Sequence, residues 1–263
     1  MTTITDLIPS AILSRFLQEQ MTCRLVVVAV SGSHAYGYPN AHSPLELKGL
    51  HIEPTENLVG LKHPPKAYNW VGEFEGYRID FSSKELGPGL KRLLKGDGSI
   101  LERILAPRQM VKGDDLQYLQ TITRGVICRR FFNYYRYFSR GVLREYEGNE
   151  HRTVRHLLGS YRLALTGVHL LRTGEIVLDL MTLANNYGFS QISELIKIHQ
   201  ESDSALLLED KHWINQLVNL HSLLESALEE SKLPIDPENP GALEEYLLDM
   251  RRSFFDACTA QRR

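Results

Sequence analysis

The segment 24–30, RLVVVAV, constrains the fold more than any other part of the chain. Its residues are nearly all apolar and mostly β-branched, which is typical of a strand that is buried on both faces. The next three residues, Ser31-Gly32-Ser33, interrupt the apolar run and predict a tight turn directly after the strand. A strand covered on both sides needs helices around it, so this part of the chain indicates an α/β fold.

The remaining pattern in the first part of the chain agrees with an α/β domain. Apolar residues at helical spacing predict a helix over 8–19, and further strands are expected over 45–53 and 77–81. The segment 54–65 contains three prolines and a glycine and is expected to be a loop-rich connection. Two further helices are expected over 84–95 and 99–105.

From residue 114 onward the strand signal disappears and only helical patterns remain. We therefore predict two domains, an α/β domain with a mixed sheet over 1–113 and an all-helical domain over 114–263. The helices of the second domain are expected over 115–146, 151–173, 178–187, 190–199, 203–231 and 241–260.

Composition and cysteine content narrow the class of protein. The 263 residues are 43% hydrophobic and 24% charged, the balance of a globular protein with a core of normal size. The start of the chain lacks the features of a secretory signal, and no apolar run is long enough to cross a bilayer. The three cysteines are widely spaced, which argues against a disulfide framework. We expect a cytoplasmic protein with no membrane partner.

Charge is distributed unevenly, although the net charge is only −2. The segment 124–162 carries nine arginines, no lysines and three acidic residues, whereas 201–250 carries twelve acidic residues and two lysines. Such asymmetry bears on electrostatic steering and on partners rather than on the fold.

The turn at Gly32 and Ser33 is a candidate phosphate-binding element. A glycine lets the backbone approach a phosphate closely, and a serine adds a hydroxyl group and an amide. A strand bearing carboxylates follows, as in sites that handle phosphates through a metal ion. Gly-Ser turns after strands are common, however, so the dipeptide alone favours an ordinary turn.

The wider pattern resembles the bacterial nucleotidyltransferases of the DNA polymerase β superfamily that are associated with RNA repair. That family carries Gly-Ser, then Ala-x-Gly, then Ser-Asp-x-Asp followed by a basic residue and glycine, and later a strand with a third carboxylate. The segments 90–105 and 152–174 also resemble the family, so the likeness covers most of the chain. The residues that match the motifs are Gly32, Ser33, Ala35, Gly37, Ser43, Lys48, Gly49 and Asp80.

This resemblance implies a polymerase β-like nucleotidyltransferase fold whose helical domain closes over a nucleotide cleft. It implies transfer of a nucleoside monophosphate from a nucleoside triphosphate to an RNA, protein or small-molecule acceptor, with Mg²⁺ as the cofactor. Glu46 and Asp80 are the implied metal ligands and catalytic residues. The implied nucleotide contacts are Gly32, Ser33, His34, Arg155 and Arg162, the two arginines lying on one helix face with Arg152 and His156. A solvated face paired with the acidic C-terminal helices is the alternative for these arginines.

One family position departs from the motif, since Pro44-Leu45-Glu46 stands where the family has Asp-x-Asp. A proline side chain cannot coordinate a metal ion, so the three-carboxylate site is incomplete. Either the protein is a degenerate member that binds a nucleotide, RNA or protein, or it catalyses with Glu46, Asp80 and a compensating ligand. The candidates for that ligand are His42, Glu53 and Glu75.

Some neighbouring residues are expected to have structural roles. Lys48 and Arg78 are expected to face away from the carboxylates in solvated or salt-bridged positions, and Glu102 is expected to be structural. The segment 129–144, RRFFNYYRYFSRGVLR, interleaves arginines with aromatic residues. Its aromatic residues recur at helical spacing, which favours core packing, although the composition also suits stacking on a single-stranded nucleic acid.

Overall fold

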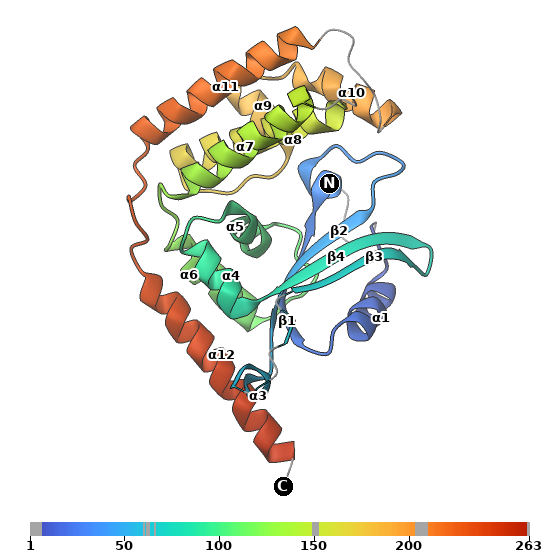
Figure 1. The fold of residues 1–263 in the computed structure, drawn as a ribbon, viewed down its shortest axis with the longest axis vertical. Coiled ribbons are helices and arrows are strands. Elements are labelled where there is room, and N and C mark those ends of the chain that lie inside the picture. Colours follow the sequence, from blue (N-terminus) through green and yellow to red (C-terminus); the bar gives the residue numbers. More distant parts are fainter. Residues whose placement is uncertain are drawn as a thin grey trace.

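The computed structural model describes residues 7–59, 61, 64–65, 67–148, 153–202 and 210–261. Four strands form one mixed sheet, which lies in the first part of the chain (Figure 1). The sheet order is β1-β2-β4-β3, with β2 parallel to β4 and the two outer pairs antiparallel. The strands are β1 (Arg24–Ser31), β2 (Leu45–Ile52), β3 (Ala67–Phe74) and β4 (Tyr77–Glu85).

Helices accompany the sheet and then make up the rest of the described chain. The first five are α1 (Ser10–Gln20), α2 (Gly32–Tyr36), α3 (Thr55–Val59), α4 (Leu86–Leu93) and α5 (Gly98–Leu105). The others are α6 (Asp114–Arg124), α7 (Phe131–Gly148), α8 (Val154–Thr173), α9 (Leu180–Tyr187), α10 (Ile192–Glu201), α11 (Lys211–Glu230) and α12 (Pro240–Gln261). The predicted fold class, a mixed α/β region followed by helices, is confirmed.

The two faces of the sheet pack against different helices (Figure 1). On one face Phe16 of α1 meets the edges of the Trp70 and Phe81 rings at centroid distances of 5.0 and 5.7 Å. On the other face Leu50 and Ile52 are fully buried in a cluster that includes residues of α4 and α5. These helices leave the end of this second face where β2 and β4 begin partly uncovered, and the partly exposed polar residues described below lie there.

Helix α8 is the core of the second half. Most of its residues are buried, because α7, α9, α10 and α11 all pack against it. Its long apolar surface therefore serves helix packing. Within the described part of the chain, no helix combines the length and the apolar character that a membrane crossing requires.

Three local predictions were wrong. Strand β3 was missed, because it is a largely exposed edge strand with little apolar burial, and it pairs with β4 through a tight Glu75-Gly76 turn. Strand β4 continues to Glu85, beyond the predicted limit of 81. The single helix expected over 115–146 is two helices, since the chain turns between Gly125 and Arg130.

Helix α12 returns to the first half of the molecule and packs against α3, α4 and α6 (Figure 1). Arg251 fixes it there: one guanidinium nitrogen lies 2.7 Å from the buried Glu85 carboxylate, and another donates to the Glu53 backbone carbonyl at 3.3 Å. Thr55 Oγ1 in turn donates to the Arg251 carbonyl at 2.7 Å. The two predicted domains are thus joined by more than the chain connection at residues 113–114.

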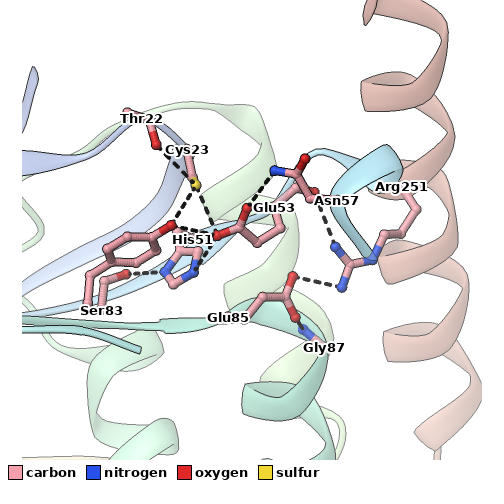
Figure 2. Close-up of polar contacts among 10 residues, drawn as sticks. Thr22, Cys23, His51, Glu53, Asn57, Ser83, Glu85, Gly87 and Arg251 are labelled. Atoms are coloured by element: carbon pink, nitrogen blue, oxygen red, sulfur yellow. Dashed lines mark hydrogen bonds and ion pairs between the residues drawn. The ribbon is translucent and has the colours of Figure 1, made fainter. Parts of the chain in front are cut away.

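A buried polar network lies beside this anchor, at the end of β2 remote from the uncovered sheet face (Figure 2). Glu53 Oε1 accepts hydrogen bonds from the Cys23 thiol at 3.1 Å and the Tyr68 hydroxyl at 3.0 Å. His51 Nδ1 lies 2.8 Å from Ser83 Oγ, and its Nε2 lies 3.7 Å from Glu53 Oε1. Burial raises the pKa of the Cys23 thiol, so the network holds a protonated thiol and not a reactive thiolate.

Two buried histidines predict a loss of stability in mild acid. Burial lowers the pKa of His51 from 6.5 to about 4, with Glu53 opposing and Arg251 reinforcing the shift. Burial likewise lowers the pKa of His221 to about 4. As pH falls, the two histidines are therefore protonated in the unfolded chain before they are protonated in the folded protein. Their contribution to stability is complete above pH 6.5 and is lost between pH 6.5 and 4.

Each histidine is expected to contribute up to about 3 kcal/mol to that loss. The measurement is the free energy of unfolding by urea at several pH values for the wild-type chain, His51→Gln and His221→Gln. Both variants are expected to show a shallower pH dependence than the wild type, whereas the exposed His212→Gln keeps the wild-type slope. Equal slopes in all four proteins would contradict the assignment.

Candidate functional site

Glu46 and Asp80 lie side by side on the uncovered end of the sheet. Strands β2 and β4 are parallel neighbours, and their register pairs Glu46 directly with Asp80. The register of the antiparallel pair places Ser31, the last residue of β1, opposite Glu46. Both carboxylates project from the face opposite to that of the buried Leu45 and Leu47. The two acidic residues singled out from the sequence are thus brought together immediately beside the Gly32-Ser33 turn.

The basic residues next to these carboxylates share their face of the sheet. Lys48 Nζ lies 3.1 Å from Asp80 Oδ1, and Arg78 donates to the His42 carbonyl at 3.3 Å. The expectation that Lys48 and Arg78 face away from the carboxylates was wrong, because residues two positions apart on a strand project from the same side. The expected salt-bridged role of Lys48 is confirmed, and it neutralises part of the charge on Asp80.

Gly32 lies against the carboxylate of Glu46. Its φ angle is +64°, and an added Cβ atom would come within 3.0 Å of all three atoms of the Glu46 carboxylate group. Only glycine fits both the backbone conformation and the space. The sequence therefore needs glycine here to let the turn after β1 reach the carboxylate on β2.

The two residues that follow belong to the short helix α2. The Ser33 carbonyl accepts a hydrogen bond from the Tyr38 amide at 3.1 Å. The Nε2 atom of His34 lies 3.4 Å from the Ser43 carbonyl, and the His34 carbonyl accepts from Arg108 at 3.0 Å. The turn and the segment that leads into β2 are thus tied together.

The register of β2 and β4 brings two carboxylates together, whereas the family motif has three. Pro44 directly precedes β2, and Glu53, one proposed substitute ligand, is held in the buried network at the other end of that strand. Glu75, another proposed substitute ligand, lies in the β3–β4 turn and pairs with Arg15 of α1. Within the described ranges no three His, Cys, Asp or Glu side chains are arranged to hold a metal ion. Two adjacent carboxylates suit one Mg²⁺ ion that also binds substrate phosphates, since Mg²⁺ often uses only one or two protein carboxylates.

A cavity of about 210 Å³ extends from these residues toward the helical half. On its wall Arg162 of α8 pairs with Glu102 of α5 at 2.7 Å, and its guanidinium stacks on the Tyr36 ring at 4.2 Å. Burial lowers the pKa of Arg162, but Glu102 and then Tyr36 raise it more, so the residue stays charged. The cavity is lined by Ala29, Val30, Ser31, Tyr36, Glu46, Lys48, Ser99, Glu102, Arg103, Tyr134, Arg162 and Leu178.

Arg155 lies on the other side of Glu46, nearer to solvent. Its Nη2 atom is 4.0 Å from Glu46 Oε1, and its side chain also lines a second cavity of about 660 Å³. His42 and His156 line that cavity too, and His156 Nδ1 lies 2.8 Å from Thr153 Oγ1. Arg152 lies outside the described residues. The arginines predicted on one helix face therefore have different environments, since Arg162 is buried and paired while Arg155 is exposed.

Sequence inspection did not find the ion pair between Glu102 and Arg162, because 60 residues separate them and no sequence motif links the two positions. Glu102 was correctly expected to be structural. The position of Lys48 beside the carboxylates was detectable from the sequence, since a residue two positions after Glu46 lies on the same side of β2.

Comparison with known protein families gives a match over most of the chain. The model of the family described as "RlaP: RNA repair pathway DNA polymerase beta family" matches residues 10–249. An uncharacterized protein of Methanocaldococcus jannaschii is 26% identical over 155 residues, which is 59% of this chain and 63% of that relative's length. A crystal structure of a nucleotidyltransferase-like protein from Exiguobacterium sibiricum 255-15 has a TM-score of 0.33 at 12% identity, over 93% of this chain and 80% of the other.

Proposed function

The chain belongs to the RlaP family, the RNA repair pathway DNA polymerase beta family, and we propose from this premise that it transfers a nucleoside monophosphate from a nucleoside triphosphate to an acceptor. The observation that carries the proposal is the register of β2 and β4, which sets Glu46 beside Asp80. The Gly32-Ser33 turn reaches the same point from β1. The turn proposed to bind phosphate and the carboxylate pair therefore meet at Glu46, which lines the cavity.

The residues around the cavity have distinct proposed roles. The backbone at Gly32 and Ser33, with His34 beside it, binds the triphosphate, because a glycine backbone lets phosphate oxygens approach closely. Arg155 lies within 4.0 Å of Glu46 and contributes positive charge at the solvent side. Arg162 contributes its charge from the inner wall, where Glu102 fixes its position.

Glu46 and Asp80 are the residues that would hold Mg²⁺, which supplies electrostatic stabilisation to the phosphates when bound. In the proposed reaction the acceptor hydroxyl oxygen bonds to the α-phosphorus, and the bond from that phosphorus to the pyrophosphate oxygen breaks. The hydroxyl proton passes to Asp80, whose side chain is 34% exposed and is the more accessible of the two carboxylates. Lys48 is placed to orient Asp80 through their ion pair.

A second function is favoured by one specific feature of the site. Pro44 removes the third carboxylate, and each remaining carboxylate already lies near a cation, Glu46 near Arg155 and Asp80 near Lys48. A cleft in which arginine and lysine take over charge neutralisation binds a triphosphate without a metal ion and does not transfer it. The two functions differ in their dependence on Mg²⁺.

Thermal unfolding with each nucleoside triphosphate, with and without Mg²⁺, tests the proposal. At a nucleotide concentration of about 100 times Kd the expected stabilisation is about 2.7 kcal/mol, which raises Tm by several degrees. Glu46→Gln and Asp80→Asn are expected to lose the magnesium-dependent part of the rise. Glu229→Gln, a matched change at an exposed position of α11, is expected to keep it.

The same experiment separates the two functions. A rise that needs Mg²⁺ supports transfer, and incubation with labelled nucleotide and candidate acceptors then detects the product. A rise of equal size without Mg²⁺ that survives in both carboxylate variants supports the binding function instead. If no nucleoside triphosphate raises Tm, both nucleotide proposals fail.

A further inference from the structure

Three aromatic rings of α7 form a surface beside the cleft. Tyr137 is 64% exposed and Phe138 is 45% exposed, and the partly buried Tyr134 ring lies 4.6 Å from that of Phe138. Phe131 and Tyr135 of the same helix are fully buried, so the predicted core packing is confirmed for those two rings, but it was wrong for the exposed Phe138. Large aromatic side chains clustered in solvent are uncommon on a protein without a ligand or partner for them. We call Tyr134, Tyr137 and Phe138 the aromatic surface.

The aromatic surface is continuous with the nucleotide cleft. Tyr134 lines the cavity that contains Glu46 and also lines a shallow groove of about 440 Å³ on the outside of α7. The segment that leads into α5 continues the same boundary, since Asp97 lines the groove and Ser99 lines the cleft. A linear ligand on the aromatic surface therefore needs to pass only the Tyr134 ring to enter the cleft.

Basic side chains accompany this path. Arg92 and the exposed Lys95 line the groove, and Arg103 lines the cleft. Asp97, which pairs with Arg92 at 2.5 Å, is the one acidic residue among those that line the groove.

We propose that the aromatic surface and the adjoining groove bind a single-stranded nucleic acid, with one end of the strand reaching the cleft as the acceptor. The acceptor role of the strand rests on the proposed nucleotidyl transfer. Strand binding itself does not depend on that activity. Exposed rings offer stacking surfaces to unpaired bases, and Lys95 and Arg92 offer cations to the phosphates between them. A duplex does not offer unpaired bases that can stack on the rings, because its bases are already paired and stacked on each other.

The arrangement fits a nucleic acid better than a protein partner. The centre of a protein interface is depleted in lysine, whereas Lys95 here adjoins the rings within the same groove. Tyr137 meets Phe138 edge to face, with centroids 5.4 Å apart and the ring planes at 87°. The two rings therefore present faces in different directions, as consecutive splayed bases require, and do not form one flat apolar patch.

Fluorescence anisotropy with labelled oligonucleotides of about 12 nucleotides, a length that covers a typical binding site, measures the predicted affinity. The full chain is expected to bind an RNA or DNA single strand more tightly than a duplex of the same sequence. The double variant Tyr137→Ala/Phe138→Ala is expected to raise Kd by roughly 10- to 100-fold, from the loss of two stacking contacts. The matched control is Tyr118→Ala, which removes a 52% exposed ring from α6 and is expected to leave Kd unchanged.

A second variant tests the electrostatic part without changing the rings. Lys95→Ala is expected to lower the slope of log Kd against log salt by about 0.7, the value for one lost phosphate contact on a single strand. Equal affinity for single strand and duplex, or equal weakening by Tyr118→Ala, would overturn the proposal. So would an absence of oligonucleotide binding at low salt.

The nucleotide experiment distinguishes this inference from the proposed function. The aromatic double variant is expected to keep the wild-type thermal stabilisation by nucleoside triphosphate, because neither Tyr137 nor Phe138 lines the cleft. Glu46→Gln is expected to lose that stabilisation while it retains strand binding. Normal strand binding without any nucleotide effect leaves the surface assignment standing and defeats both proposed nucleotide functions.

Discussion

Glu102→Ala is expected to lower the free energy of unfolding by about 3–5 kcal/mol, the usual cost of leaving one partner of a buried ion pair alone. Glu102 and Arg162 are both nearly buried, and the atoms that pair are 2.7 Å apart. The variant loses the carboxylate, while Arg162 keeps its charge because the guanidinium pKa is so high. The Tyr36 ring alone does not replace a carboxylate as its partner.

Urea denaturation of the variant measures this cost, with Glu230→Ala as its control. Glu230 pairs with Arg172 at 3.2 Å on the surface, where an ion pair contributes less than about 1 kcal/mol. The double variant Glu102→Leu/Arg162→Met is expected to recover most of the loss, since two apolar side chains of similar size leave no buried charge. A loss below about 1 kcal/mol in Glu102→Ala would mean that Arg162 reaches solvent through the cleft.

This ion pair illustrates what the sequence does not disclose. Residues that share a strand or helix reveal their neighbours through spacing. The Glu46–Asp80 pair joins two strands and was expected from the family resemblance instead. The pairing of α5 with α8 depends on how two distant helices dock, and no local period encodes that distance. Arg162 was accordingly predicted as a phosphate contact from the family resemblance and its helix face, without knowledge of its carboxylate partner.

The errors in secondary structure have a related cause. The strand over 24–30 was predicted because burial on both faces leaves a continuous apolar signal. Strand β3 lies at the sheet edge with mostly exposed side chains, so its residues show little apolar contrast. The return of α12 to the first half depends on Arg251, whose partners lie far earlier in the chain: Glu53 directly follows β2, and Glu85 ends β4.

Gly32→Ala is expected to abolish the magnesium-dependent stabilisation by nucleoside triphosphate and to lower any transfer rate about 100-fold, as misplacement of a reacting group by about 1 Å does. The added Cβ atom meets the Glu46 carboxylate, so either the turn or the carboxylate must move. The left-handed backbone at Gly32 adds a cost of roughly 1–2 kcal/mol for any residue with a Cβ atom.

Gly76→Ala separates these two effects, because Gly76 has a φ angle of +82° and no atom within 4 Å of an added Cβ. In Gly76→Ala the strained backbone is expected to lower the free energy of unfolding, while nucleotide binding is kept. Introducing Gly32→Ala into a Glu46→Asp background completes a double-mutant cycle. The shorter carboxylate withdraws from the added methyl group, so Gly32→Ala is expected to lower Tm less in that background. An equal fall in Tm in both backgrounds would show that backbone strain, and not contact with Glu46, requires glycine at this turn.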